Sequence, residues 1–171
     1  MTSVTAESLR LKPFLSHTQL YANPGSILMS DALLTYRGTV YPWHCDHVGH
    51  MNVMWYVGKF DEATWHLFNA IGLSPPYLRS AQRGMAAVDQ HISYLQELHA
   101  GAVVSVRTRV LEVKERSLRF EHEMVDESTA AVAARTTLKA VHLDTAQRKS
   151  AAFTATVVAK AQALIASTAT A

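Results

Sequence analysis

Residues 43–56 read Trp-His-Cys-Asp-His-Val-Gly-His-Met-Asn-Val-Met-Trp-Tyr and place a carboxylate, Asp46, a few residues before an expected long helix. A helix start offers free backbone N–H groups and the positive end of the helix dipole. A carboxylate beside such donors can attack a carbonyl carbon, or activate water, while the donors stabilise the developing oxyanion. The segment therefore predicts a catalytic carboxylate at a helix N-terminus.

An expected strand precedes this segment. From Leu33 to Tyr41 the side chains alternate with the period of two that is typical of a strand. Pro42 lacks a backbone donor and therefore suits the end of that strand.

The helix that follows is predicted from about Val53 to Ile71. Apolar side chains recur at steps of three or four residues and line one face, namely Val53, Val57, Phe60, Thr64, Leu67 and Ile71. Lys59 is expected to lie off this face. Gly58 weakens a helix by roughly 1 kcal/mol relative to Ala, and we expect close packing against a neighbouring backbone to compensate. Gly72 is expected to cap the C-terminus of the helix.

Four strands in a meander are expected after the helix. Alternation runs through residues 86–94, 104–110, 118–124 and 131–143, and the breaks between them are short and polar, as in antiparallel hairpins. One helix cannot cover both faces of such a sheet. The predicted fold class is therefore α+β, with an antiparallel sheet wrapped around the central helix and the remaining surface left to a partner subunit.

The chain divides into three predicted parts. Residues 1–32 form an N-terminal extension, residues 33–150 form the domain, and residues 151–171 form an Ala-rich C-terminal helix and tail. No internal repeat is visible in the sequence.

Composition limits the classes of function. The chain has 171 residues, of which 49% are hydrophobic and 18% charged, and its net charge is +2, as in ordinary soluble domains. No basic block indicates nucleic acid, no apolar run approaches the roughly 18 residues of a membrane span, and no stretch resembles a secretory signal. The single cysteine excludes an internal disulfide. We expect a cytoplasmic enzyme or binding protein with no nucleic-acid or membrane partner.

The loop and the order of elements resemble the hotdog-fold thioesterases of the 4-hydroxybenzoyl-CoA thioesterase type. The loop of that family reads approximately Asp-x-Asp-x-x-Gly-His-x-Asn-Asn-x-x-Tyr, between the first strand and the central helix. Five positions of this chain match it in register: Asp46, Gly49, His50, Asn52 and Tyr56. Two positions depart from it, because His44 replaces the earlier Asp and Val53 replaces the second Asn.

The resemblance implies hydrolysis of an acyl-CoA thioester to a carboxylate and free CoA, without a metal or other cofactor. Asp46 would act as nucleophile or general base, and a backbone N–H near Val53 would donate to the oxyanion. The implied substrate-binding residues are Gly49, His50, Asn52, Val53 and Tyr56. A homodimer or homotetramer with active sites at the subunit interface is also implied.

The residues of the loop leave alternatives open. Asp46 could instead cap the loop or the helix, and His50 could be a general base or could only tie the loop together. Asn52 could hold the loop or contact the thioester, and Gly49 could supply an unusual backbone angle or allow close substrate approach. Adjacent residues cannot easily converge on one ion, so no metal site is predicted from the donors His44, Cys45, Asp46, His47 and His50.

Other candidates lie outside the loop. Asp61 or Glu62 could supply a second carboxylate, although such residues are more often surface groups. The CoA phosphates would need cations, for which the candidates are Lys114, Arg116, Arg119, Arg79 and Arg83. The alternative functions are an acyl-carrier-protein thioesterase and a non-catalytic acyl-thioester binder, and the acyl chain stays open.

Overall fold

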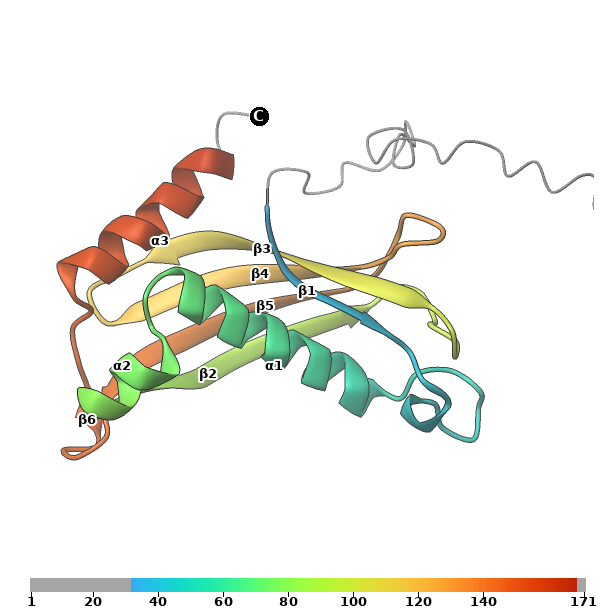
Figure 1. Ribbon diagram of the computed structural model, residues 1–171, viewed down its shortest axis with the longest axis horizontal. Coiled ribbons are helices and arrows are strands. Elements are labelled where there is room, and N and C mark those ends of the chain that lie inside the picture. The colour runs from blue at the N-terminus through green and yellow to red at the C-terminus, as the bar shows by residue number, and fades with distance from the viewer. Residues whose placement is uncertain (1–31, 169–171) are drawn as a thin grey trace, which may run out of the picture.

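The computed structural model describes residues 32–168 (Figure 1). The first strand, β1 (Leu33–Thr39), leads through one 3-10 turn, η1 (Pro42–His44), into the long helix α1 (Val53–Ala70). The predicted strand and the predicted helix are both confirmed, each with ends within two residues of the expectation. Residues 1–31, which make up nearly all of the expected N-terminal extension, lie outside the described residues.

The C-terminal end of α1 has the expected glycine cap. The N–H of Leu73 donates to the carbonyl oxygen of Phe68 at 2.8 Å, which closes a Schellman motif. Gly72 has a φ of +96°, a conformation that glycine adopts without the penalty of a side chain. The chain can therefore leave the helix and begin a second one almost at once.

That second helix, α2 (Pro75–Ser80), is absent from the sequence-based expectations. Ser74 is its N-cap, and its side chain accepts from the N–H of Tyr77. Prolines occupy the first two helical positions, where a missing N–H has little effect. The Pro75-Pro76 pair thus both prevents continuation of α1 and starts α2.

The remaining strands form one antiparallel sheet with β1. They are β2 (Arg83–Tyr94), β3 (Val103–Val113), β4 (Ser117–Asp126), β5 (Ala131–Asp144) and the short β6 (Lys149–Ser150). The order across the sheet is β1-β3-β4-β5-β2, with β6 beside β5. The predicted meander is confirmed for β3, β4 and β5, which pair in succession, but it is wrong for β2. β2 pairs with β5 at one edge, and the chain crosses to begin β3 beside β1 at the other. Alternation in a sequence indicates which face is buried, but it does not indicate which strand is the neighbour.

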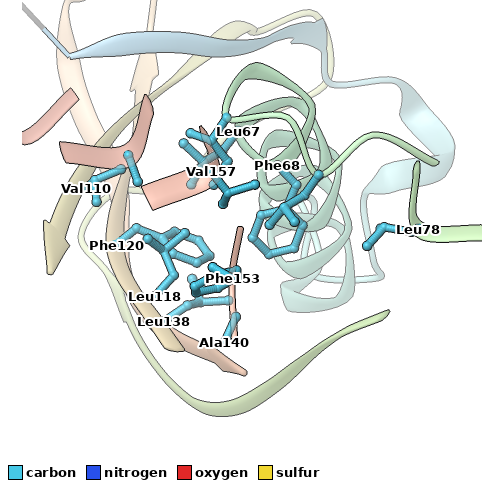
Figure 2. Close-up of a cluster of buried hydrophobic side chains, with 13 residues drawn as sticks. Leu67, Phe68, Leu78, Val110, Leu118, Phe120, Leu138, Ala140, Phe153 and Val157 are labelled. Carbon is cyan, nitrogen blue, oxygen red and sulfur yellow. The ribbon is translucent and has the colours of Figure 1, made fainter. Parts of the chain in front are cut away.

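The two long helices, α1 and the C-terminal helix, pack on the same face of the sheet. One buried cluster joins α1 and α2 to β3, β4, β5 and the C-terminal helix α3 (Ala155–Thr168), as Figure 2 shows. Its members include Leu67, Phe68, Phe120, Leu138, Phe153 and Val157. A second cluster beneath the N-terminal half of α1 includes Met51, Tyr56, Phe60 and Leu98. Among the described helices, none has the length and apolar character needed to cross a membrane.

The buried face of α1 differs from the predicted apolar stripe at its N-terminal end. Val53 is 55% exposed and Val57 is 39% exposed, although both were expected to be buried. At Gly58 no atom of the described chain, apart from the neighbouring backbone of the helix itself, lies within 4 Å of the position that a Cβ would take. The described chain therefore does not supply the expected close packing against a backbone. The first two turns of α1 therefore present apolar surface that the described chain does not cover.

Lys59, expected off the buried face, is only 3% exposed. Its Nζ donates to the hydroxyl of Tyr36 at 3.0 Å and to the carbonyl oxygen of Thr39 at 3.3 Å. A Cβ at Gly38 would overlap the Tyr36 hydroxyl, so glycine there makes room for the phenol. A lysine can bury its alkyl chain among apolar groups while its charged end reaches polar partners, and this is why hydropathy alone misplaces it.

A chain of hydrogen-bonded side chains crosses the core. Thr108 Oγ1 lies 2.6 Å from both Thr35 Oγ1 and His122 Nδ1, and His122 Nε2 lies 2.9 Å from Thr64 Oγ1. Thr64 in turn donates to the carbonyl oxygen of Phe60. Because that bond uses the Thr64 proton, His122 donates from Nε2 and accepts at Nδ1. The imidazole is therefore satisfied as a neutral group, and burial lowers the pKa of His122 to about 3.

Candidate active site

Asp46 lies in a closed loop between η1 and α1. Cys45 and Met51 pair across the base of this loop as an isolated antiparallel bridge. The N–H of Asp46 donates to His50 O at 3.1 Å, and the N–H of Gly49 donates to Asp46 O at 3.0 Å. Gly49 has a φ of +94°, and open space surrounds the position of a Cβ. Backbone conformation rather than lack of room therefore requires glycine here, and the expected unusual backbone angle is confirmed.

Two contacts from a distant segment hold the loop in place. The N–H of Met51 donates to the carbonyl oxygen of Leu98 at 2.7 Å. His99 Nδ1 lies 3.1 Å from the carbonyl oxygen of Gly49, 50 residues earlier in the chain. Leu98 and His99 belong to the connection between β2 and β3. Neither residue was predicted from the sequence, because no local pattern signals a contact over such a separation.

The carboxylate of Asp46 accepts two hydrogen bonds, one at each oxygen. Oδ1 accepts from the N–H of Val48 at 2.9 Å, and Oδ2 accepts from Nδ2 of Asn52 at 3.1 Å. The Val48 N–H, then the Asn52 amide, hold the pKa of Asp46 below its usual value, with smaller contributions from His50 and His47. The carboxylate is therefore ionised at neutral pH.

Asn52 connects this carboxylate to the start of α1. It is the N-cap of the helix, and its Oδ1 accepts from the N–H of Met54 at 3.0 Å. Its carbonyl oxygen accepts from the N–H of Trp55 at 2.9 Å. Within residues 32–168, the N–H of Val53 has no hydrogen-bond partner, as is usual in the first turn of a helix. An ionised carboxylate and a free helix donor thus lie on either side of Asn52.

His50 lies in the loop, and its side chain is close to Glu97. Its Nε2 is 3.8 Å from Oε1 of Glu97, and its side chain forms no hydrogen bond with the described residues. The imidazole of His99, and not that of His50, bonds to the loop. A substrate contact by His50 stays a prediction.

Tyr56 lies beneath the loop, 4% exposed. Its hydroxyl donates to the carbonyl oxygen of Gln96 at 3.1 Å, and its ring meets the ring of Tyr94 edge to face at 5.2 Å. Burial raises the pKa of Tyr56 to about 12, so the phenol is neutral. Its visible role is to support the segment that anchors the loop, and a substrate contact by Tyr56 stays a prediction.

His44 occupies the position at which the resembling family has its earlier Asp. It is 7% exposed, its Nδ1 accepts from the N–H of Tyr41 at 3.1 Å, and its ring packs 4.2 Å from that of Trp55. Burial first, and the charge of Lys59 second, lower the pKa of His44. Its carbonyl oxygen accepts from the N–H of Asn52 at 2.9 Å. The backbone of His44 therefore supports the N-cap, its imidazole is neutral, and the hydrogen bonds to Asp46 are intact.

The metal-ligand residue types of the loop do not converge. Within residues 32–168, no three side chains of His, Cys, Asp or Glu are arranged to hold a metal ion. The half-buried Cys45 thiol instead points to the carbonyl oxygen of Tyr41, at 3.9 Å.

The cations considered for CoA phosphates lie in two places. Three of them form ion pairs: Lys114 with Glu112 at 3.2 Å, Arg116 with Glu115 at 3.3 Å, and Arg83 with Asp144 at 2.7 Å. The first two pairs flank the β3–β4 turn and are exposed, where such pairs contribute little stability. Phosphate binding by that turn stays a prediction.

The family model of the thioesterase-like superfamily matches residues 40–161 of the chain. The chain belongs to this superfamily. Betainyl-CoA thioesterase of Pseudomonas aeruginosa is 29% identical over 136 residues, which are 80% of this chain and 86% of that protein. L-Carnitine dehydrogenase/betainyl-CoA thioesterase of Agrobacterium fabrum is 31% identical over 135 residues, which are 79% of this chain. The chain spans only 28% of the length of that second relative.

Membership of the superfamily agrees with the architecture. A Staphylococcus aureus protein solved in complex with CoA has the same fold, with a TM-score of 0.75 and 20% sequence identity over 80% of this chain and 86% of that chain. The predicted α+β hotdog fold and the predicted thioesterase family are both confirmed.

Proposed function

We propose that this protein is an acyl-CoA thioesterase that releases a carboxylate and free CoA. The observation that carries the proposal is the ionised Asp46 carboxylate, bonded to Val48 and Asn52 and adjacent to the free N–H of Val53. Membership of the thioesterase-like superfamily supports this reaction class, and both curated relatives are named as thioesterases.

In the general-base route, the Asp46 carboxylate removes a proton from water while the water oxygen bonds to the thioester carbonyl carbon. The carbonyl π electrons move to oxygen, and the Val53 N–H, aided by the helix dipole, stabilises that oxyanion. Collapse of the tetrahedral intermediate breaks the C–S bond. CoA leaves as a thiolate and takes the proton from Asp46.

In the nucleophilic route, an oxygen of Asp46 bonds to the carbonyl carbon and the CoA thiolate leaves from an acyl–aspartyl anhydride. Water then hydrolyses the anhydride and restores the carboxylate. Both routes need the ionised form of Asp46. A single turnover in ¹⁸O-labelled water separates them, because label incorporated into the Asp46 side chain requires the anhydride.

The proposed substrate contacts remain Gly49, His50, Asn52, Val53 and Tyr56. In support, the first four belong to the loop or to its junction with α1, and Gly49 brings no side chain between the carboxylate and solvent. Tyr56 would contribute through the buried layer beneath them.

We also propose a homodimer, which could pair again into a tetramer. The strand β2 lies at an edge of the sheet, and 12-residue edges of this kind readily pair with another chain. Exposed apolar side chains mark protein interfaces when they gather, and several lie along β2 and around the loop: Trp43, Val48, Val53, Met54, Val57, Val88 and Tyr94. A partner on this surface would cover the Asp46 loop and complete the site.

Release of free thiol from a panel of acyl-CoAs tests the activity. The panel should include short, long and aromatic acyl groups, with the matching acyl-carrier-protein thioesters alongside. Turnover of CoA esters in preference to carrier-protein esters supports the proposal. Tight binding without release of thiol would instead indicate a non-catalytic acyl-thioester binder.

A further inference from the structure

A small cleft lies between α1 and the edge strand β2. Its volume is about 110 Å³, and β4 and β5 form its floor. Its walls are mainly apolar and include Val57, Trp65, Phe68, Met85, Phe120 and Leu138. The cleft is small and mainly apolar, so it suits a short group rather than a long acyl chain.

Asp61 is the only charged residue in the lining of this cleft. Within residues 32–168, its carboxylate has neither an ion pair nor a hydrogen bond. Trp65 follows one helical turn later, 42% exposed, with its ring perpendicular to that of Phe68 at 5.7 Å. A carboxylate beside an accessible indole is a combination that attracts organic cations, through Coulomb attraction and through cation–π interaction.

The cleft begins close to the candidate reaction centre. Val57 is four residues beyond Val53, or about 6 Å along the helix axis, and Asp61 is about 12 Å along it, at roughly 1.5 Å per residue. Helical side chains lean toward the N-terminus, which brings the Asp61 carboxylate nearer than its backbone. A short acyl group whose carbonyl is bound at Val53 would therefore extend toward Asp61.

The charge of the acyl group decides whether it suits this cleft. A neutral chain would remove water from the Asp61 carboxylate without replacing the lost interactions, and an anionic group would be repelled. A cationic group would offset that desolvation.

We therefore propose that the substrate carries a fixed positive charge on a short acyl group, and that Asp61, with Trp65, recognises this charge in the cleft. The inference rests on the proposed thioesterase function and names its substrate class. Both curated relatives are named for betainyl-CoA, whose acyl group ends in a trimethylammonium group. That group is short and compact, as a small cleft requires.

The test compares thioesters that have one shape and different charge. Betainyl-CoA is paired with 3,3-dimethylbutyryl-CoA, in which carbon replaces the ammonium nitrogen. A longer pair, 4-(trimethylammonio)butyryl-CoA and 5,5-dimethylhexanoyl-CoA, covers a deeper position in the cleft. For the pair that is hydrolysed faster, we expect kcat/KM to be at least tenfold higher for the cationic member.

The variant Asp61→Asn removes the charge and keeps the size of the side chain. It should lower kcat/KM for the cationic ester at least tenfold and change that for the neutral ester little. Glu62→Gln is the matched control, because Asp61 and Glu62 are neighbouring carboxylates that are both exposed, and only Asp61 lines the cleft. It should leave both values, and therefore their ratio, unchanged.

The outcomes separate this inference from the proposed function. Equal hydrolysis of both members of each pair, or an unchanged ratio in Asp61→Asn, would overturn the inference and leave the thioesterase proposal intact. If the folded protein releases thiol from no acyl-CoA, the proposed function fails. Equilibrium binding of the same pairs to wild type and to Asp61→Asn would then still decide whether Asp61 selects a cation.

Discussion

Asn52 bonds to Asp46 and to the start of α1 with one side chain: its Nδ2 lies 3.1 Å from Asp46 Oδ2, and its Oδ1 lies 3.0 Å from the N–H of Met54. The position of the carboxylate is therefore set relative to the helix that presents the free N–H of Val53. Any loss at Asn52 should affect both the base and the oxyanion donor.

Replacement of Asp46 by Asn should abolish most of the turnover. The substitution keeps the shape of the side chain but removes its charge and basicity. We expect kcat to fall by about 10² or more, the usual contribution of a positioned base, while binding of a substrate analogue changes little. Thiol release from the preferred acyl-CoA measures the first quantity, and calorimetry measures the second. Glu97→Gln, at an exposed carboxylate near His50, is the control, and nearly wild-type turnover in Asp46→Asn would remove Asp46 from the mechanism.

Two substitutions of Asn52 should separate its two roles. Asn52→Ala removes the N-cap, which costs about 1 kcal/mol of stability, and removes the donor that helps to keep the pKa of Asp46 low. Asn52→Asp keeps the cap but places a negative charge beside Asp46, which raises the pKa of Asp46. Activity needs the ionised carboxylate and is lost as pH falls through that pKa. In both variants the acid limb of the kcat/KM profile should therefore move to higher pH. Both should lose stability at neutral pH, Asn52→Ala chiefly through the lost cap and Asn52→Asp through the repulsion between the two carboxylates. Unmoved acid limbs would contradict the coupling.

Acidification from pH 7 to pH 5 should destabilise the fold. Burial lowers the pKa of His122 to about 3 and also lowers that of His142. Below about pH 6.5, the usual pKa of histidine, the unfolded chain binds protons at these positions that the folded chain does not bind. Stability therefore rises with pH in this window, by up to about 1.4 kcal/mol per pH unit for each group. Urea unfolding at several pH values measures the slope.

A titration of the individual imidazoles checks the assignment of that slope. The NMR signals of His122 should stay those of a neutral ring down to pH 5. Protonation of His122 near pH 6.5 in the folded protein would refute the account of the buried hydrogen-bond chain.

Light scattering should give a particle of at least twice the 18.9 kDa mass of one chain. Val88→Lys, on the exposed edge strand β2, should weaken the assembly and lower activity with it. Leu34→Lys is the matched control, because Leu34 lies on β1 at the opposite edge and is 40% exposed. A fully active monomer would contradict the shared-site proposal.

Much of the fold could be predicted from local sequence. Period-two alternation identified the strands β1 to β5, and steps of three and four identified α1, because these periods report which side chains face the core. Gly49 and Gly72 were singled out correctly because both adopt a positive φ that other residues rarely take. The position of Asp46 beside a helix start also followed from the chain alone.

The rest depends on contacts between distant segments. Alternation contains no information on strand partners, so the position of β2 beside β5 was missed. The Asp46 loop is held by Leu98 and His99, which lie in the connection between β2 and β3. Lys59 is buried because the Tyr36 hydroxyl and the Thr39 carbonyl oxygen accept hydrogen bonds from it. None of these partners can be identified before the fold is known.

The order of strands has a consequence for how the chain folds. The first strand, β1, has its sheet partner in β3, and the side chains of Thr35 and Thr108 that meet there are 73 residues apart. The Asp46 loop is likewise held by a residue much later in the chain, because the carbonyl oxygen of Leu98 accepts a hydrogen bond from the N–H of Met51. Contacts of such long range are slow to form, because closing a long loop of chain precedes any gain from the contact. During synthesis, the segment that carries the candidate site therefore emerges early and is ordered late, after β3 has left the ribosome.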